Sequence, residues 1–487
     1  MKKLLFFYAL LFIIAFSSPK GEAAEDNIRY FTLDNGMRFI LYRRTFSPTF
    51  SACITVASGA KDEKPGKTGI AHFLEHMAFS GTETIGTTDY KKEEALTLEK
   101  NALLLKTRDT KAGESEAPSI KARLEEIDKE LDRIIKKDEL WDIYQREGAA
   151  GLNAITGMDM TSYFVSLPAN KLELWACLEG ERLEKPVFRG FESEKRVIME
   201  ERKEKFQVST SGMLYEKVIE EAFFGTPYGH TVIGSQADLG GMTAADVADF
   251  YKEFYSPDKT VCAIVGDIDF EAAETLMRKY FGRIRKESGN TESVAGIPLI
   301  FGGEKRVTLK LKRNPHLIIG HYKPTYPDRD NFAFKAIKGL LAGGRTSALH
   351  RKLITELGMA ARLSIYESPG EMLNNMFIIN IIPVHPYKTA DIEPEVYKVL
   401  ETFAGGGIGP EELQKIKNQI NTSFLRSLQS NRDMAHNLAY YETVTGSYED
   451  LFSYAGKIET LTAEDITAAF KKYFRASNRV VGEISHE

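Results

Sequence analysis

The sequence predicts an α+β protein of two homologous halves, each with a mainly antiparallel sheet packed by helices, plus a charged helical hairpin inserted in the first half. Three observations lead to this prediction: the size and composition, an internal repeat and one highly charged segment. The chain has 487 residues, of which 43% are hydrophobic and 27% charged, so two or more domains with full cores are expected. The net charge of −5 gives no electrostatic footprint for nucleic acid, and no nucleic-acid partner is predicted.

The repeat joins residues 243–262 to residues 462–481, which align without gaps. Each segment opens with a threonine suited to a helix N-cap, continues as an amphipathic helix and ends in a β-branched strand. Chance similarity between amphipathic helices is the alternative, but a duplication is favoured.

Under a duplication each half begins with strands, over residues 28–54 and 305–321, and ends with the helix and strand of the repeat. The stretch 286–303 carries Gly, Ser and Pro and is the predicted linker. The predicted domains are residues 26–290 and 300–487.

About half of the residues between 89 and 147 are charged, with both signs mixed. Residues 113–118 interrupt the helical pattern, which predicts a helical hairpin. A solvated strut is favoured over a partner-binding arm. Apolar residues recur with the alternating spacing of a coiled-coil seam at Ile120, Leu124, Ile127, Leu131 and Ile134.

The first residues have the pattern of an export signal. Lys2 and Lys3 precede an apolar run from Leu4 to Phe16, which is short for a bilayer. Small residues follow, and cleavage is predicted after Ala23, so residues 1–23 form a signal peptide. An uncleaved membrane anchor is the alternative. No later run approaches membrane length, so a periplasmic or secreted protein is predicted, with no transmembrane segment after cleavage.

The chain has three cysteines, which is too few for a disulfide scaffold. Each lies in an apolar stretch, so buried free thiols are the favoured interpretation. A bridge between Cys53 and Cys262 stays open as an alternative in an oxidising compartment. The third cysteine is Cys177.

One helical segment carries the pattern His72-Phe-Leu-Glu75-His76. The two histidines are one turn apart on the same helix face, a spacing that suits two corners of a tetrahedral zinc site. Glu75 reaches that face and can act as a base on a water beside the metal. The alternative is a pair of surface histidines beside a glutamate.

A catalytic zinc needs a third protein ligand and an open fourth position. The acidic helical segment 192–202 offers Glu201, with Glu194 on the same face as a carboxylate behind a ligand histidine. From helix geometry alone this is weak, because acidic helices are usually solvated. A purely structural zinc would need a fourth Cys or His, and none is suitably spaced.

The His72–His76 motif resembles the inverted zinc motif of the pitrilysin/insulinase metallopeptidases, the inverzincins. Further matches run in order along nearly the whole chain beyond the signal. The two-half layout is similar to the branch of the mitochondrial processing peptidase and its bacterial exported relatives. The other matching segments are 151–163 with an Asn-Ala-x-Thr strand, 194–201, 227–234 and 343–349.

The resemblance implies one Zn²⁺ per chain, held by His72, His76 and Glu201. It implies that Glu75 is the general base and Glu194 a supporting carboxylate. It also implies that the strand 151–157, with Asn153 and Ala154, is a sheet edge that pairs with an extended peptide substrate. An ordinary strand is the alternative.

One departure from the family pattern concerns the second half. The family often carries Leu-Arg-x-x-x-Gly-x-x-Tyr, whose Arg and Tyr reach the opposing active site and stabilise the oxyanion. In this chain Ile354 and Ala361 stand at those positions, and neither side chain can donate a hydrogen bond. A heterodimer with a paralogous, zinc-less subunit that supplies the pair is therefore expected, with a homodimer as the alternative.

The predicted function is a zinc-dependent endopeptidase that hydrolyses peptides or unfolded polypeptides, as the catalytic subunit of a two-chain clam-shell. The alternative is a non-catalytic peptide-binding or assembly subunit on the same fold. Loss of a ligand would favour that alternative, but all three ligands and the base are present in the sequence.

Overall fold

The computed structural model describes residues 27–108, 117–286 and 302–485. The predicted signal peptide and nearly all of the predicted linker lie outside the described residues. Within the described part of the chain, no helix combines the length and apolar character needed to span a bilayer.

The first half contains a six-stranded sheet whose last strand, β4, is an edge. Neighbouring strands are antiparallel except β2 and β6, which run parallel. In spatial order the strands are β1 (Ile28–Thr32), β2 (Arg38–Arg43), β6 (Thr260–Gly266), β3 (Thr49–Val56), β5 (Thr161–Pro168) and β4 (Ala150–Thr156).

The second half contains a five-stranded sheet with the same topology once β1 is set aside. Here too only one pair, β7 and β11, is parallel. The predicted α+β fold of two similar halves is thereby confirmed. In spatial order the strands are β7 (Lys305–Lys310), β11 (Arg479–Ser485), β8 (His316–Lys323), β10 (Asn375–Pro383) and β9 (Ala360–Ser368).

The repeated segments form the same helix and strand in each half. Helix α10 (Ala244–Phe254) leads to β6, and α18 (Ala463–Tyr473) leads to β11. Both helices begin with a capping box, made by Thr243 with Asp246 and by Thr462 with Asp465. The reciprocal hydrogen bonds satisfy backbone donors at the first turn. Because they need particular residues three positions apart, the capping box can be recognised in the sequence.

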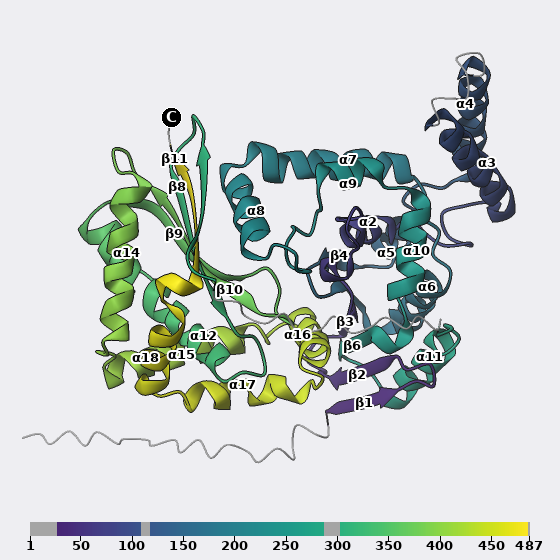
Figure 1. The fold of residues 1–487 in the computed structure, drawn as a ribbon. Coiled ribbons are helices and arrows are strands. Elements are labelled where there is room, and N and C mark those ends of the chain that lie inside the picture. The colour runs from purple at the N-terminus through teal and green to yellow at the C-terminus, as the bar shows by residue number, and fades with distance from the viewer. Residues whose placement is uncertain (1–26, 109–116, 287–301, 486–487) are drawn as a thin grey trace, which may run out of the picture.

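Each half contributes one helix that packs on the sheet of the other half. Helix α8 (Thr210–Ala222) buries Leu214 and Val218 against the second sheet. Helix α16 (Asn431–Val444) buries Met434 and Leu438 against the first sheet, and Figure 1 shows it beside β3 and β6. Each such aliphatic side chain contributes about 1.5–3 kcal/mol on burial, so the exchanged helices hold the halves together.

The opposite faces of the sheets are covered by helices of their own half. In the first half these are α6 (Leu172–Glu184) and α11 (Phe270–Phe281), which bury Trp175 and Phe281. In the second half they are α12 (Asp330–Ala342), α14 (Thr389–Ala404) and α18. The other helices are α2 (Ile70–Met77), α5 (Glu139–Arg146), α7 (Phe191–Lys203), α9 (Gln236–Gly241), α13 (Ala348–His350), α15 (Pro410–Arg426) and α17 (Glu449–Glu459).

The predicted hairpin is formed by α3 (Tyr90–Arg108) and α4 (Ala117–Ile134), which project from the body in Figure 1. Leu96 of α3 packs against Ile127 and Leu131 of α4, two of the predicted seam residues. Helix α5 lies within the range 89–147 but buries Leu140 and Tyr144 in the first core. The projecting hairpin is therefore shorter than that range.

The cysteine thiols are free, and Cys53 and Cys262 are buried. On the paired strands β3 and β6, Cys53 faces helix α16, whereas Cys262 faces the core under α6 and α11. The two thiols therefore lie on opposite faces of the sheet, and the bridge left open by the sequence does not form. Burial raises the pKa of the Cys53 thiol to about 12.

Candidate metal centre

Helix α2 presents the predicted motif on the face turned away from the core. Ile70, Phe73, Leu74 and Met77 are buried, whereas His72, Glu75 and His76 share the other face. The helix begins after Gly69, whose φ of 93° is the left-handed conformation that glycine adopts without strain. The Glu63 carboxylate accepts the backbone N–H groups of Gly69 and Ala71 and so fixes the first turn.

Helix α7 brings the third predicted ligand to the histidine pair. An oxygen of Glu201 lies 3.8 Å from His72 Nε2 and 3.6 Å from His76 Nε2. One ligand atom from each of the three residues falls within 4.8 Å of the others, which is close enough to hold one metal ion. Residues 125 positions apart in the sequence thus converge because α2 and α7 pack through Phe73 and Phe191.

Two further side chains orient this cluster. Glu194 lies on the same helix, with its carboxylate 3.4 Å from His76 Nδ1. Lys205 donates to the other oxygen of Glu201 at 2.6 Å, from the π-helical turn Glu204–Val208 that follows α7. Glu194 therefore constrains the ring of His76, and Lys205 constrains the carboxylate of Glu201, as is usual around metal ligands.

Electrostatics keep one imidazole neutral and favour protonation of the other. Burial, followed by the charge of His76, lowers the pKa of His72 to about 4. Burial opposes the charged form of His76, but the hydrogen bond with Glu194 and the nearby carboxylates raise its pKa. Burial opposes the carboxylate of Glu201, yet Lys205 and the two histidines lower its pKa.

The edge strand β4 forms one wall of a cleft of about 490 Å³ over the cluster. Thr156 Oγ1 donates to Glu75 at 2.6 Å, so the strand fixes the glutamate. Ala154, Ile155 and Thr156 line the cleft. Asn153 is exposed on the same strand, and its side-chain oxygen accepts the backbone N–H of Ala154 at 2.9 Å.

Some cleft residues were not singled out from the sequence. Lys205 could have been found, because it stands four residues after Glu201 on a helical run. Tyr215 of the exchanged helix α8 and Pro369 of the second half also line the cleft. Pro369 reaches it through tertiary packing, and no local pattern signals that contact.

Two family models match the chain. "Insulinase (Peptidase family M16)" matches residues 38–110, which include the His72–His76 motif, and "Peptidase M16 inactive domain" matches residues 241–420. The chain belongs to the M16 peptidase (insulinase) family. The resemblance to the pitrilysin/insulinase metallopeptidases is thereby confirmed.

Relatives in the M16 family span nearly the whole chain. The zinc protease PqqE of Helicobacter pylori is 25% identical and covers 98% of this chain and 96% of its own length. The probable mitochondrial-processing peptidase subunit beta of Schizosaccharomyces pombe is 21% identical and covers 85% of this chain and 82% of its own.

Solved structures show the same fold. A crystal structure of a protease from Helicobacter pylori superposes with a TM-score of 0.79 at 22% identity, covering 94% of this chain and 99% of that one. The periplasmic protease PqqL of Escherichia coli gives 0.70 at 17% identity and covers 94% of this chain. This chain spans only 48% of PqqL, so one PqqL chain has the length of two such chains.

Proposed function

We propose that this M16 family member is an exported zinc endopeptidase that cleaves peptides or unfolded polypeptides. The observation that carries the proposal is the convergence of His72, His76 and Glu201 beside Glu75, which is not needed as a ligand. The "zinc protease" relatives support the same metal and activity.

The donor set suits zinc. Two imidazoles and one carboxylate are ligands that Zn²⁺ accepts, and three protein ligands leave a fourth position open, as in catalytic sites. The ligand atoms face one another across distances that one ion would bridge. The bound ion would polarise the scissile carbonyl and make an attacking water more acidic.

Residues of this chain transfer the proton and orient the reacting groups. Glu75 takes the proton of the attacking water on its carboxylate and passes it to the leaving amine nitrogen. Thr156 holds that carboxylate through its hydroxyl and so keeps the base in one orientation. Glu194 fixes the ring of His76, and Lys205 fixes Glu201.

The edge strand β4 supplies a way to hold an extended substrate. Among the described residues β4 pairs only with β5, so its outer backbone groups are open to a peptide strand. Added strands bind mainly through the backbone, which tolerates many sequences, as the proposed substrate class requires. Asn153 and Ala154 lie on this strand and are the proposed substrate-binding residues.

The decisive experiment compares wild type with Glu75→Gln for zinc content and cleavage of a quenched peptide library. The proposal expects one zinc per chain in both proteins and cleavage only by wild type, because the variant keeps the ligands and loses the base. Glu192→Gln on the exposed face of α7 is the matched control and should cleave like wild type. Zinc binding without cleavage in wild type, under every pairing tried, would favour the non-catalytic peptide-binding subunit.

We further propose that the active form contains two chains. One PqqL chain has the length of two chains like this one, and the first half of PqqL alone covers 94% of this chain. Since Ile354 and Ala361 cannot donate hydrogen bonds to an oxyanion, a zinc-less paralogue is the proposed partner and a second copy the alternative. Export rests on residues 1–23 and agrees with the periplasmic PqqL.

A further inference from the structure

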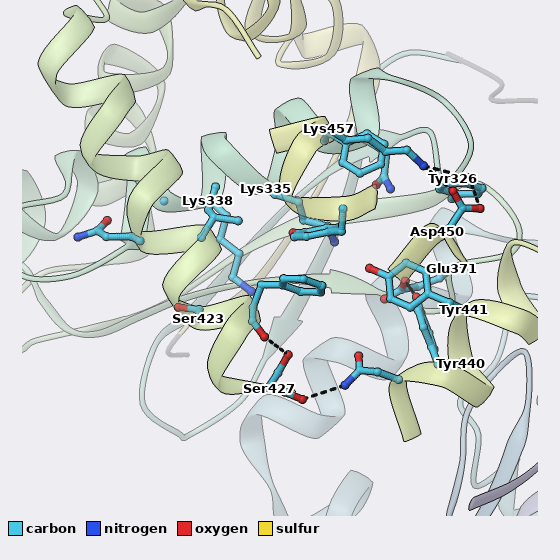
Figure 2. A pocket seen from close by; sticks show the side chains of 18 of the residues that line it. Tyr326, Lys335, Lys338, Glu371, Ser423, Ser427, Tyr440, Tyr441, Asp450 and Lys457 are labelled. Atoms are coloured by element: carbon cyan, nitrogen blue, oxygen red, sulfur yellow. Dashed lines mark hydrogen bonds and ion pairs between the residues drawn. The ribbon is translucent and has the colours of Figure 1, made fainter. Parts of the chain in front are cut away.

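The second half contains a cavity of about 490 Å³ that the proposed peptidase reaction does not use. Helices α12, α15, α16 and α17 form its walls, and Tyr326 and Glu371 complete them from loops. Figure 2 shows Lys335 and Lys338 on one side of this cavity and Tyr440 and Tyr441 on the other.

The cavity occupies the place in the second half that the metal cleft occupies in the first. Counting from the ends of the equivalent strands β3 and β8, positions 72, 75 and 76 correspond to Gly339, Ala342 and Gly343. Helices α7 and α15 both begin directly after a glycine, and by that count position 201 corresponds to Ile420. All four of these counterparts line the cavity.

These replacements remove every metal-ligating group and leave apolar space. Two glycines and an alanine occupy little volume, and the walls around them are rich in aromatic rings. The rings of Phe424 and Tyr454 lie 4.5 Å apart, and those of Phe332 and Tyr454 lie 6.0 Å apart. The aromatic residues of the lining are Tyr326, Phe332, Phe424, Tyr440, Tyr441 and Tyr454.

The lining carries three lysines and two carboxylates. Asp450 accepts from Lys457 and from the hydroxyl of Tyr326, both at 2.6 Å. Glu371 accepts from the hydroxyl of Tyr440.

Both carboxylates of the lining therefore have partners. Lys335 pairs at 2.7 Å with Glu367, which lies outside the lining. Lys338 is exposed and makes no ion pair within the part of the chain that the structure describes.

We propose that this cavity is a binding site for a small organic anion with an aromatic body. The ring would stack among Phe424, Tyr454 and their aromatic neighbours, where the lost ligands leave room. The anionic group would face Lys338, the lining cation without an ion-pair partner. A free aromatic carboxylic acid and the C-terminal residue of a short peptide share this chemistry.

The test is direct binding to the full-length protein, measured by titration calorimetry, so it does not depend on peptidase activity. The probes are N-acetyl-L-tryptophan, the neutral N-acetyl-L-tryptophanamide and a tripeptide that ends in tryptophan. Ser423→Trp places an indole in the mouth of the cavity. Thr422→Trp is its matched control, since Thr422 is exposed on the same helix and does not line the cavity.

We expect saturable binding of N-acetyl-L-tryptophan with a dissociation constant below about 1 mM, and binding at least about tenfold weaker for the amide. Ser423→Trp should abolish binding, Thr422→Trp should not, and Lys338→Gln should weaken the carboxylate toward the level of the amide. Tripeptide binding without binding of the free acid would assign the site to peptide ends. The proposal would be overturned if none of the probes bound saturably or if the acid and the amide bound equally. Binding that survives Ser423→Trp would overturn it as well.

Discussion

At the residue scale, the hydroxyl of Thr156 hydrogen-bonds the proposed base to the edge strand. Thr156→Val keeps the shape of the side chain and removes the donor. We expect kcat to fall about tenfold to a hundredfold, because small misplacements of a catalytic group have effects of this size. Zinc affinity should stay unchanged, since the hydroxyl of Thr156 bonds to Glu75 and not to a proposed ligand.

Thr156→Ser is the matched control for that prediction. It keeps the hydroxyl and should retain most of the wild-type kcat. Equal losses in the Val and Ser variants would mean that the methyl group, and not the hydrogen bond, is what matters. Steady-state kinetics with zinc content measured in parallel separates the two results.

Protons should compete with zinc for the two proposed ligand histidines at different pH values. A histidine must be neutral to bind metal, so zinc affinity falls as pH drops through the pKa of each ring. The pKa of His76 is raised above its ordinary value of 6.5, whereas that of His72 is lowered to about 4. The logarithm of zinc affinity should therefore fall with a one-proton slope near neutral pH and approach a two-proton slope only near pH 4.

Competition with a chromophoric chelator across pH measures this profile. Glu194→Gln removes the hydrogen-bonded carboxylate that raises the pKa of His76, so the one-proton fall should begin at lower pH. Glu192→Gln, exposed on the same helix, should leave the profile where it is. A two-proton slope already at neutral pH would contradict the difference between the two rings.

At the element scale, one buried carboxylate after β4 adds to the joint that the exchanged helices make between the halves. Asp159 accepts the hydroxyl of Tyr228 at 2.5 Å and the backbone N–H groups of Glu371 and Met372 at 2.6 and 3.2 Å. Asp159→Ala leaves the buried Tyr228 hydroxyl and two partly buried backbone donors without their acceptor, so we expect a loss of about 3–5 kcal/mol in unfolding free energy. Urea titration followed by circular dichroism measures it.

Asp249→Ala provides the control, because Asp249 is exposed on helix α10. Its effect should stay within about 0.5 kcal/mol. A loss for Asp159→Ala no larger than the control would mean that water replaces the missing acceptor. In that case the loop around Glu371 is not held by this carboxylate.

Local signals in the sequence were enough to predict several of these elements. The capping boxes at Thr243 and Thr462 and the seam of Ile127 and Leu131 act over a few residues, so they can be recognised without a structure. The pairing of Glu201 with the histidines needed the family resemblance, because the packing of α7 on α2 is not encoded in either helix alone.

Other features arise only from tertiary packing. The exchange of α8 and α16 between the halves cannot be predicted from either sequence segment. An amphipathic pattern shows that a helix has an apolar face but does not indicate which sheet that face covers. The same holds for Pro369 in the metal cleft and for the opposite facing of Cys53 and Cys262. The end of the hairpin cannot be located from charge for a related reason: charge density continues into α5, although that helix packs in the first core.

At the scale of the whole molecule, the similarity of the two halves explains why the described residues hold one candidate metal cluster and one counterpart cavity. The first half carries the proposed ligands on α2 and α7, whereas the equivalent positions at the end of α12 and on α15 carry Gly, Ala and Ile. Within the described residues this chain therefore has one candidate metal centre, in its first half. If Ile354 and Ala361 stand at the positions of the Arg/Tyr pair, that pair has to come from a partner chain.

The proposed two-chain assembly should be evident in the kinetics. Wild type purified alone should bind zinc yet cleave a quenched peptide slowly, and addition of a zinc-less paralogue that carries the Arg/Tyr pair should raise kcat about a hundredfold or more, the usual effect of an oxyanion donor. The partner alone should neither bind zinc nor cleave. Kinetics at several mixing ratios should reach a maximum at one partner per chain. Full activity of this chain alone, rising with its own concentration, would instead establish a homodimer that works without the pair.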